Sequence, residues 1–326
     1  MRERRLLVLL LAVGLVLMAA ATAAANNPQD QWAGTKHNVK NLDTAAEDAP
    51  IKRDNCIACH DGQGFANNVV KRADLPEAVR GTLNSVDCGV CHGPRAKAMM
   101  DSGDPGKLSN GFQIKGAGSG ALCIYCHNGR KMPDAAQKPA PHRSPQFDVV
   151  FAVGGARVAG ESYPSSPHGA NPDTCVSCHM AELDGMANHT FAVVDKPEYV
   201  EKACGDCHPG LATVNRTALS DYDGDKVVEG IQDEVKGLIA VLEKAVEEKE
   251  QGLGAHFGES HGSFHWVDKA NAELKVPDAL YYARFNLALV EEDGSYGVHN
   301  PAYVVALLQK SYKQLTGQDV PGAVLR

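Results

Sequence analysis

All ten cysteines of the 326-residue chain belong to five copies of one pattern, Cys-x-x-Cys-His. The copies comprise Cys56, Cys59 and His60; Cys88, Cys91 and His92; Cys123, Cys126 and His127; Cys175, Cys178 and His179; and Cys204, Cys207 and His208. Disulfides and zinc sites also use paired cysteines, but neither requires a histidine after the second cysteine in every copy. The pattern is the attachment site of a c-type haem, in which the thiols bind the porphyrin and the histidine binds the iron. We therefore predict five covalently bound haem c groups.

The composition is poor in the side chains that usually fill a hydrophobic core. Only 6% of the residues are aromatic, and the chain holds 32 Gly and 17 Pro. Five large apolar porphyrins attached between Cys56 and His208 would supply the missing apolar interior. We expect a mainly α, loop-rich multihaem cytochrome c with a covalent haem core and C-terminal helices.

The amino terminus has the features of an export signal. Residues 1–5 include three Arg, residues 6–25 form an apolar run, and small residues precede Asn26. We predict a signal peptide over residues 1–25 that is cleaved before Asn26, and a periplasmic or extracellular location. The alternative is an uncleaved anchor, because 20 apolar residues can span a bilayer. We expect no membrane span after cleavage.

The acidic balance of the chain bears on its partners. A formal net charge of −8 at pH 7 argues against a protein that binds nucleic acid. An acidic surface, deepened by haem propionates, predicts docking to basic redox proteins that weakens as salt is added. A quinol dehydrogenase, another cytochrome and a terminal reductase are the partner classes we expect.

Each iron has a second axial position, and eight histidines outside the motifs are candidates for it. They are His37, His142, His168, His189, His256, His261, His265 and His299. Eight exceed the five needed, so every iron can have two imidazole ligands. Met99 and Met100 offer alternative sulfur ligands, although we expect them to pack against a porphyrin face. Two imidazoles leave no open position for a substrate, which predicts electron transfer.

Two stretches resemble the pentahaem cytochrome c nitrite reductases and their octahaem relatives. The first runs from Ser166 to Met180 and continues with His189 and the fifth motif; the second runs from Ala283 to Tyr303. The resemblance implies that distal ligands cross between haems. By that resemblance His168 binds the fifth haem, His189 the second, His37 the third and His299 the fourth.

The chain departs from those reductases at their active site. The reductases carry Lys in the first motif and leave the other side of that iron open, whereas this chain has His60. Their Lys-x-Gln-His segment is missing from residues 155–164. We therefore predict a non-catalytic, electron-transfer member in which His142 closes the first haem, with His256, His261 and His265 as weaker candidates. The alternatives are a reductase of nitrite, hydroxylamine or sulfur oxyanions with an open first haem, and a filament-forming cytochrome.

After the fifth motif the sequence pattern becomes helical. We divide the mature chain into a pentahaem-binding region, residues 26–215, and a C-terminal helical region, residues 216–326, that supplies a distal ligand. An apolar stripe from Val228 to Ala245 predicts a helix over about residues 226–250. Residues 279–291 and 301–315 are two further predicted helices, the last with Pro301 in its first position. The stripe is explained equally well by packing against these helices and by a homodimer interface.

Three alternating carboxylates, Asp221, Asp223 and Asp225, resemble the start of a calcium loop. Glycine stands at the fourth position of this segment and Lys226 at the sixth, where a calcium-binding EF-hand requires glycine. We therefore favour an acidic turn before the long helix, with a calcium site as the alternative.

Overall fold

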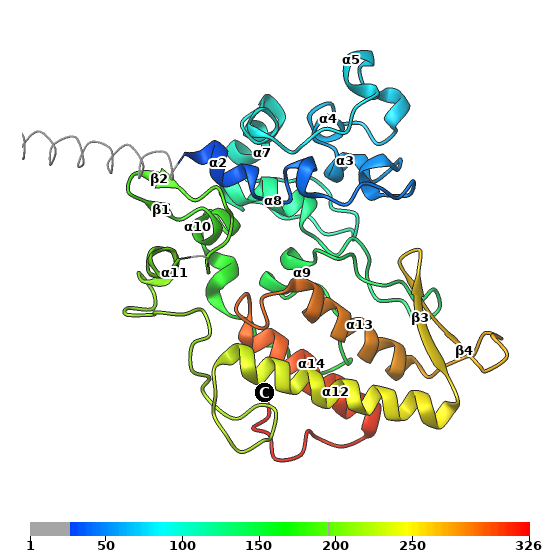
Figure 1. Cartoon of the computed structure of the whole chain (residues 1–326). Coiled ribbons are helices and arrows are strands. Elements are labelled where there is room, and N and C mark those ends of the chain that lie inside the picture. Colours follow the sequence, from blue (N-terminus) through cyan, green and yellow to red (C-terminus); the bar gives the residue numbers. More distant parts are fainter. Residues whose placement is uncertain (1–26, 195) are drawn as a thin grey trace, which may run out of the picture. The chain divides into compact units, whose positions relative to one another are not determined.

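The computed structural model describes residues 27–194 and 196–326 (Figure 1). The predicted signal peptide lies outside the described residues. Most elements are helices joined by long loops, and the strands of the described part form two small antiparallel hairpins. The expected mainly α, loop-rich architecture is confirmed. Among the described residues, none of the helices has the length and apolar character needed to cross a bilayer.

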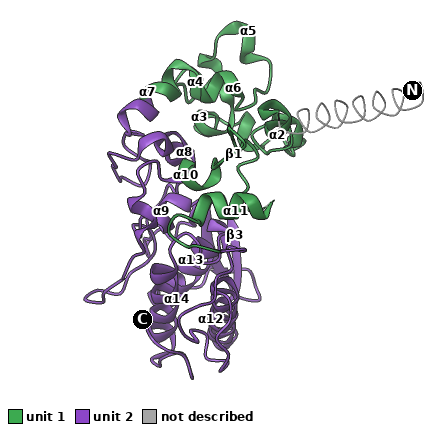
Figure 2. Cartoon of the chain, turned by 90° about the vertical axis from the view of Figure 1, so that its left-hand side faces the viewer, with its two compact units in different colours: residues 1–98, 176–210 green, residues 99–175, 211–326 purple. Residues whose placement is uncertain are grey.

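The chain divides into two compact units, each built from two segments (Figure 2). Unit 1 comprises residues 1–98 and 176–210, and unit 2 comprises residues 99–175 and 211–326. This division follows packing, and it groups residues 99–175 with the C-terminal helices. The predicted boundary between residues 215 and 216 separates haem-bearing from haem-free sequence, and it stays a prediction.

Unit 1 consists of short helical pieces. They are α2 (Pro28–Ala33), η1 (Val39–Asn41), η2 (Pro50–Lys52), α3 (Ile57–His60), α4 (Gly62–Ala66), η3 (Arg72–Asp74), α5 (Glu77–Arg80), α6 (Cys88–Cys91) and α11 (Pro197–Cys204), with a hairpin of β1 (Glu182–Leu183) and β2 (Met186–Ala187). Helix α7 (Pro94–Ser102) and helix α10 (Cys175–His179) each cross a boundary between the units. Met99 and Met100, the alternative sulfur ligands, lie on α7.

Backbone segments of unit 1 approach one another more closely than side chains would allow. A Cβ on Gly62 would clash with the carbonyl of Ser85, and one on Gly64 would clash with the carbonyl of Ile57. The fully buried Asp61 caps α4 by accepting from the amides of Gln63 and Gly64. Close backbone contacts at glycine and a buried carboxylate therefore help to hold this region together.

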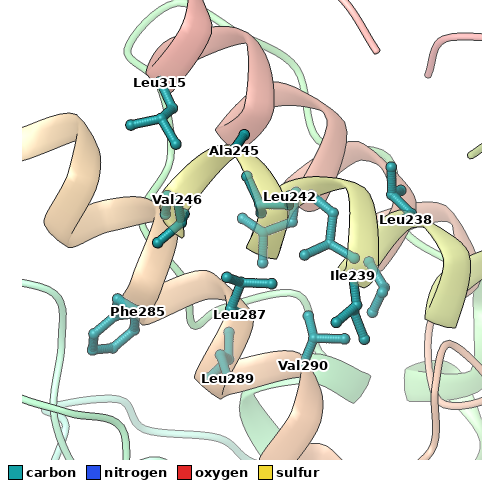
Figure 3. Close-up of a cluster of buried hydrophobic side chains, with 14 of the residues drawn as sticks. Leu238, Ile239, Leu242, Ala245, Val246, Phe285, Leu287, Leu289, Val290 and Leu315 are labelled. Carbon is teal, nitrogen blue, oxygen red and sulfur yellow. The ribbon is translucent and has the colours of Figure 1, made fainter. Parts of the chain in front are cut away.

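Unit 2 contains the long helices. Its elements are η4 (Gly118–Gly120), α8 (Ala121–Cys126), α9 (Gln146–Val150), η5 (Pro167–Ala170), α12 (Ile231–Leu253), α13 (Asp278–Asp293) and α14 (Pro301–Thr316), with a hairpin of β3 (His256–Ser260) and β4 (Ser263–Val267). Side chains of α12, α13 and α14 converge in one hydrophobic cluster (Figure 3). The three predicted helices are confirmed, and the apolar stripe of α12 is buried within its own unit.

The start of the long helix differs from its prediction. Helix α12 begins at Ile231, and Val228 is 50% exposed outside it. Gly230 is the N-cap and pairs with Thr217 in an isolated β-bridge, so the backbone before Ile231 is extended. The predicted start at about residue 226 is therefore too early, because the apolar periodicity begins before the helix does.

Candidate haem sites

Each of the five motifs forms one helical turn. The amide of the motif histidine donates to the carbonyl of the first cysteine at 3.0 Å for His60, and at 2.8 Å for His92, His127 and His208. The fourth motif is helix α10 itself. Residues at positions i, i+3 and i+4 share one helix face, so both thiols and the imidazole of a motif lie on the same side. None of these ten cysteines forms a disulfide in the structure. This donor set fits a c-type haem.

Two motif histidines have their Nδ1 atoms engaged by acceptors. His127 Nδ1 lies 3.1 Å from Oε1 of Gln146, and His179 Nδ1 donates to the carbonyl of Phe191 at 2.7 Å. A histidine that binds metal through Nε2 commonly donates its other ring N–H to such an acceptor, which fixes the tautomer and the ring orientation. Gln146 and Phe191 received no role from the sequence, and the structure places them as orienting residues.

Four of the predicted distal ligands show the same arrangement. The Nδ1 atoms of His168 and His189 donate to the carbonyls of His299 and Ala187, at 3.1 and 2.9 Å. His142 Nδ1 lies 3.2 Å from Oγ of Ser144, and His299 Nδ1 lies 2.6 Å from Oδ1 of Asp293. A histidine whose Nδ1 is engaged in this way binds an iron through Nε2.

One predicted proximal and distal pair lies within unit 1. The imidazoles of His92 and His189 have ring centroids 6.4 Å apart and planes inclined by 29°. Two imidazoles on opposite sides of one metal, each with a metal–nitrogen bond of about 2 Å, have centroids about 6 Å apart. The spacing thus fits an iron shared by His92 and His189. The other four predicted pairs each take one residue from each unit, and they stay predictions.

His37 lies beside the residue that orients His179. The ring of Phe191 meets the His37 imidazole edge-on, with centroids 5.0 Å apart. The His37 carbonyl accepts from the amide of Val86, whose own carbonyl accepts from the Trp32 indole at 2.9 Å. The amino-terminal segment is therefore anchored to unit 1 on both sides of His37.

Asp293 is held rigidly beside His299. Its side chain is 1% exposed, and its second oxygen accepts from the hydroxyl of Ser295 at 2.5 Å. Burial lowers the pKa of His299, but the charge of Asp293 and its hydrogen bond outweigh burial, so the net pKa of the imidazole is raised. The carboxylate is thus a strong acceptor for this ring.

Asn300 joins three segments around the distal ligands. Its side-chain amide donates to the carbonyl of Val149 and to the hydroxyl of Ser165, and its oxygen accepts from the amide of Ser166. The same oxygen accepts from the amide of Tyr303 and so caps α14. Asn300 is fully buried, which fits a positioning role for the loop that carries His168.

The weaker candidates for the first haem lie on the β3–β4 hairpin. His256 and His261 are exposed, and His265 is half-buried with its ring over Gly258. The alternative sulfur ligand Met99 packs against a small cluster around Phe147 and Ile124.

The oxygen atoms of Asp221, Asp223 and Asp225 lie within 4.8 Å of one another. Their carboxylates also accept from backbone amides of the same turn, including those of Gly224 and Val227. These bonds describe an acidic turn before α12, and no further observation supports calcium there.

No protein-family model matches the chain, and no curated protein does. Among solved structures, the outer cell wall cytochrome OcwA has a similar fold, with a TM-score of 0.52 and 21% identity over 89% of this chain. The chain spans 50% of the length of that cytochrome. The likeness concerns the fold alone, so the predicted relationship to nitrite reductases is not tested by it. The described chain thus has a mainly helical, loop-rich fold that it shares with a cytochrome.

Proposed function

We propose that the chain is an exported pentahaem c-type cytochrome that relays electrons between redox proteins. The observation that carries this proposal is the set of five Cys-x-x-Cys-His turns, each with its two thiols and its imidazole on one helix face. Haem iron, when bound, takes up and releases one electron. The fold that the chain shares with an outer cell wall cytochrome supports this function and an exported location.

The oriented imidazoles favour an electron carrier over a catalyst. Distal candidates from separate segments have Nδ1 engaged, which presents Nε2 in a fixed direction. Ligands fixed in this way change little when the iron is oxidised or reduced, and they occupy the position that a substrate would need. The His92 and His189 pair is the clearest case, because the spacing of its rings fits two axial ligands on one iron.

The negative net charge of the chain favours partners that carry positive charge. With a formal net charge of −8, the chain is expected to dock on basic surfaces of a donor or an acceptor. Such docking is steered by long-range attraction and weakens as ionic strength rises.

Mass spectrometry and EPR of the oxidised protein test the proposal. We expect a mass that includes five haems and low-spin signals only. His142→Ala is expected to convert one of the five irons to high spin, because that variant removes the ligand predicted for the first haem. His261→Ala is the matched control, since His261 lies exposed at the tip of the β3–β4 hairpin and is expected to leave the spectrum unchanged.

The outcomes separate the functions. An unmodified mature chain would refute haem binding altogether. A high-spin iron in the wild-type protein that turns over nitrite or hydroxylamine would refute the carrier and favour a reductase. An unchanged spectrum in His142→Ala, with a high-spin signal in His261→Ala, would assign the distal ligand of the first haem to the β3–β4 hairpin.

A further inference from the structure

The acceptor at His299 differs in charge from the acceptors at the other oriented imidazoles. The Nδ1 atoms of His168, His179 and His189 face backbone carbonyls. His127 faces a side-chain amide oxygen and His142 a hydroxyl. Among these six rings, His299 alone faces a carboxylate, that of Asp293 at 2.6 Å.

The position of Asp293 is not explained by the stability of its helix. Asp293 is the last residue of α13, and Gly294 follows it in the left-handed conformation. A negative charge at a helix C-terminus opposes the helix dipole and costs stability. The carboxylate is nevertheless buried and held by Ser295, whose amide also donates to it at 3.3 Å. A buried charge kept at an unfavourable helix end points to a role toward the ring it contacts.

A carboxylate that accepts from Nδ1–H draws the proton away from the ring and makes Nε2 a stronger electron donor. The interaction is strengthened by burial, because the effective dielectric constant falls away from water. A stronger donor stabilises the oxidised iron, which carries the larger positive charge.

We propose that Asp293, acting through His299, lowers the reduction potential of the haem iron that His299 binds below that of the irons whose distal rings face neutral acceptors. The proposal rests on the proposed function, since it requires His299 to bind an iron. Asp293 is a positioning and tuning residue, and it does not touch the iron.

His168 provides an internal reference for this effect. Its Nδ1–H donates to the carbonyl of His299, so both imidazoles are oriented by the same short segment of chain. The two acceptors differ in charge, one a neutral carbonyl and the other a carboxylate. A change confined to Asp293 should therefore alter the iron of His299 and leave the iron of His168 unchanged.

The test compares Asp293→Asn with Glu292→Gln in the full haem-loaded protein. Asparagine keeps a side-chain oxygen within reach of His299 but removes the charge. Glu292→Gln removes a neighbouring charge whose carboxylate pairs with Arg143 at 3.7 Å. Potentials are measured by spectroelectrochemical titration, and the low-spin irons are distinguished by EPR.

We expect Asp293→Asn to raise the potential of one iron of five and to move the largest g value of one low-spin signal. We expect Glu292→Gln to leave that signal in place and to produce a smaller shift in potential. Five low-spin irons with potentials insensitive to Asp293→Asn would overturn the inference and leave the carrier function standing. Loss of haem or a high-spin wild-type iron would instead count against the proposed function.

A measurement on the wild-type protein keeps the inference falsifiable if Asp293→Asn does not fold. The native chain should show one low-spin EPR signal of a more strongly donating imidazole among its bis-imidazole signals. Five signals that all correspond to neutral imidazole ligands would overturn the proposal without any variant.

Discussion

The two units stabilise themselves by different means. Unit 2 buries a continuous cluster from α12, α13 and α14, including Leu238, Leu242 and Leu287 (Figure 3). Both hydrophobic clusters of the described residues lie in unit 2, and unit 1 buries fewer apolar side chains, among them Phe65 and Leu75. Unit 1 holds three complete haem motifs, whereas unit 2 holds one.

The contrast indicates what the proposed haems would contribute to stability. Porphyrins attached at its three complete motifs would bring a large apolar surface to the unit that buries fewer apolar side chains of its own. We infer that unit 1 depends on haem for its fold, and that the helices of unit 2 depend on their own side chains.

Blocking haem attachment is expected to have the largest effect. A chain produced without haem should lose protection from hydrogen exchange throughout unit 1, while α12, α13 and α14 stay protected. The reason is that the helical cluster is closed by side chains alone. Hydrogen exchange with mass spectrometry, read peptide by peptide, measures the difference. Equal loss of protection in α12 and in residues 56–92 would break the comparison.

Shortening a buried side chain of the α12, α13 and α14 cluster should destabilise unit 2 and leave unit 1 unaffected. Leu242→Ala removes a fully buried side chain of α12 and is expected to cost about 2–5 kcal/mol of unfolding free energy in unit 2. The haem spectrum should not change, because Leu242 lies among α13 and α14 side chains and not among motif residues.

Val228→Ala is the matched control for that substitution, since Val228 is 50% exposed just before the same helix. We expect it to change stability by less than about 0.5 kcal/mol. Urea denaturation followed by circular dichroism measures both variants. Loss of haem or a changed Soret band in Leu242→Ala would show that the cluster also holds the haem sites.

The sequence predicted the motifs and helices α13 and α14 because their signals are local. A Cys-x-x-Cys-His turn needs only five consecutive residues, and Pro301 marks the start of α14 at the residue where the structure has it. The start of α12 was predicted too early, because an apolar period does not report that Gly230 pairs with Thr217.

The residues that orient the imidazoles could not be predicted, because their partners are distant in sequence or are backbone groups that carry no sequence signal. Asn300 contacts Ser166 across 134 residues, and His168 contacts a carbonyl, which every residue possesses. Asp293 stands six residues before His299, a spacing that carries no known pattern. The division into units was equally hidden, since each unit is assembled from two separate segments.

The two units each bury a carboxylate, and the smallest effect on stability is expected from the one in unit 2. In unit 1, Asp61 forms an ion pair with Arg72 at 2.8 Å. In unit 2, Asp148 on α9 accepts from the backbone amide of Gly129 and from the side-chain amide of Asn110. Burial raises the pKa of Asp148, and the charge of Asp293 makes a smaller contribution in the same direction. A raised pKa means that the folded chain binds this proton more tightly than the unfolded chain does. The stabilisation from this carboxyl is therefore complete below its ordinary pKa and is lost as the pH rises through the raised value.

Asp148→Asn should abolish that loss. We expect the unfolding free energy of the variant to vary less with pH than that of the wild type as the pH rises above the ordinary range of a carboxyl group. Asp278→Asn, an exposed acid at the start of α13, is the control and should retain the wild-type slope. Urea denaturation at each pH measures the slopes. A carboxyl group with a raised pKa makes stability fall as the pH rises, so removing that group must make the fall shallower. A steeper fall in Asp148→Asn would therefore contradict the raised pKa of Asp148.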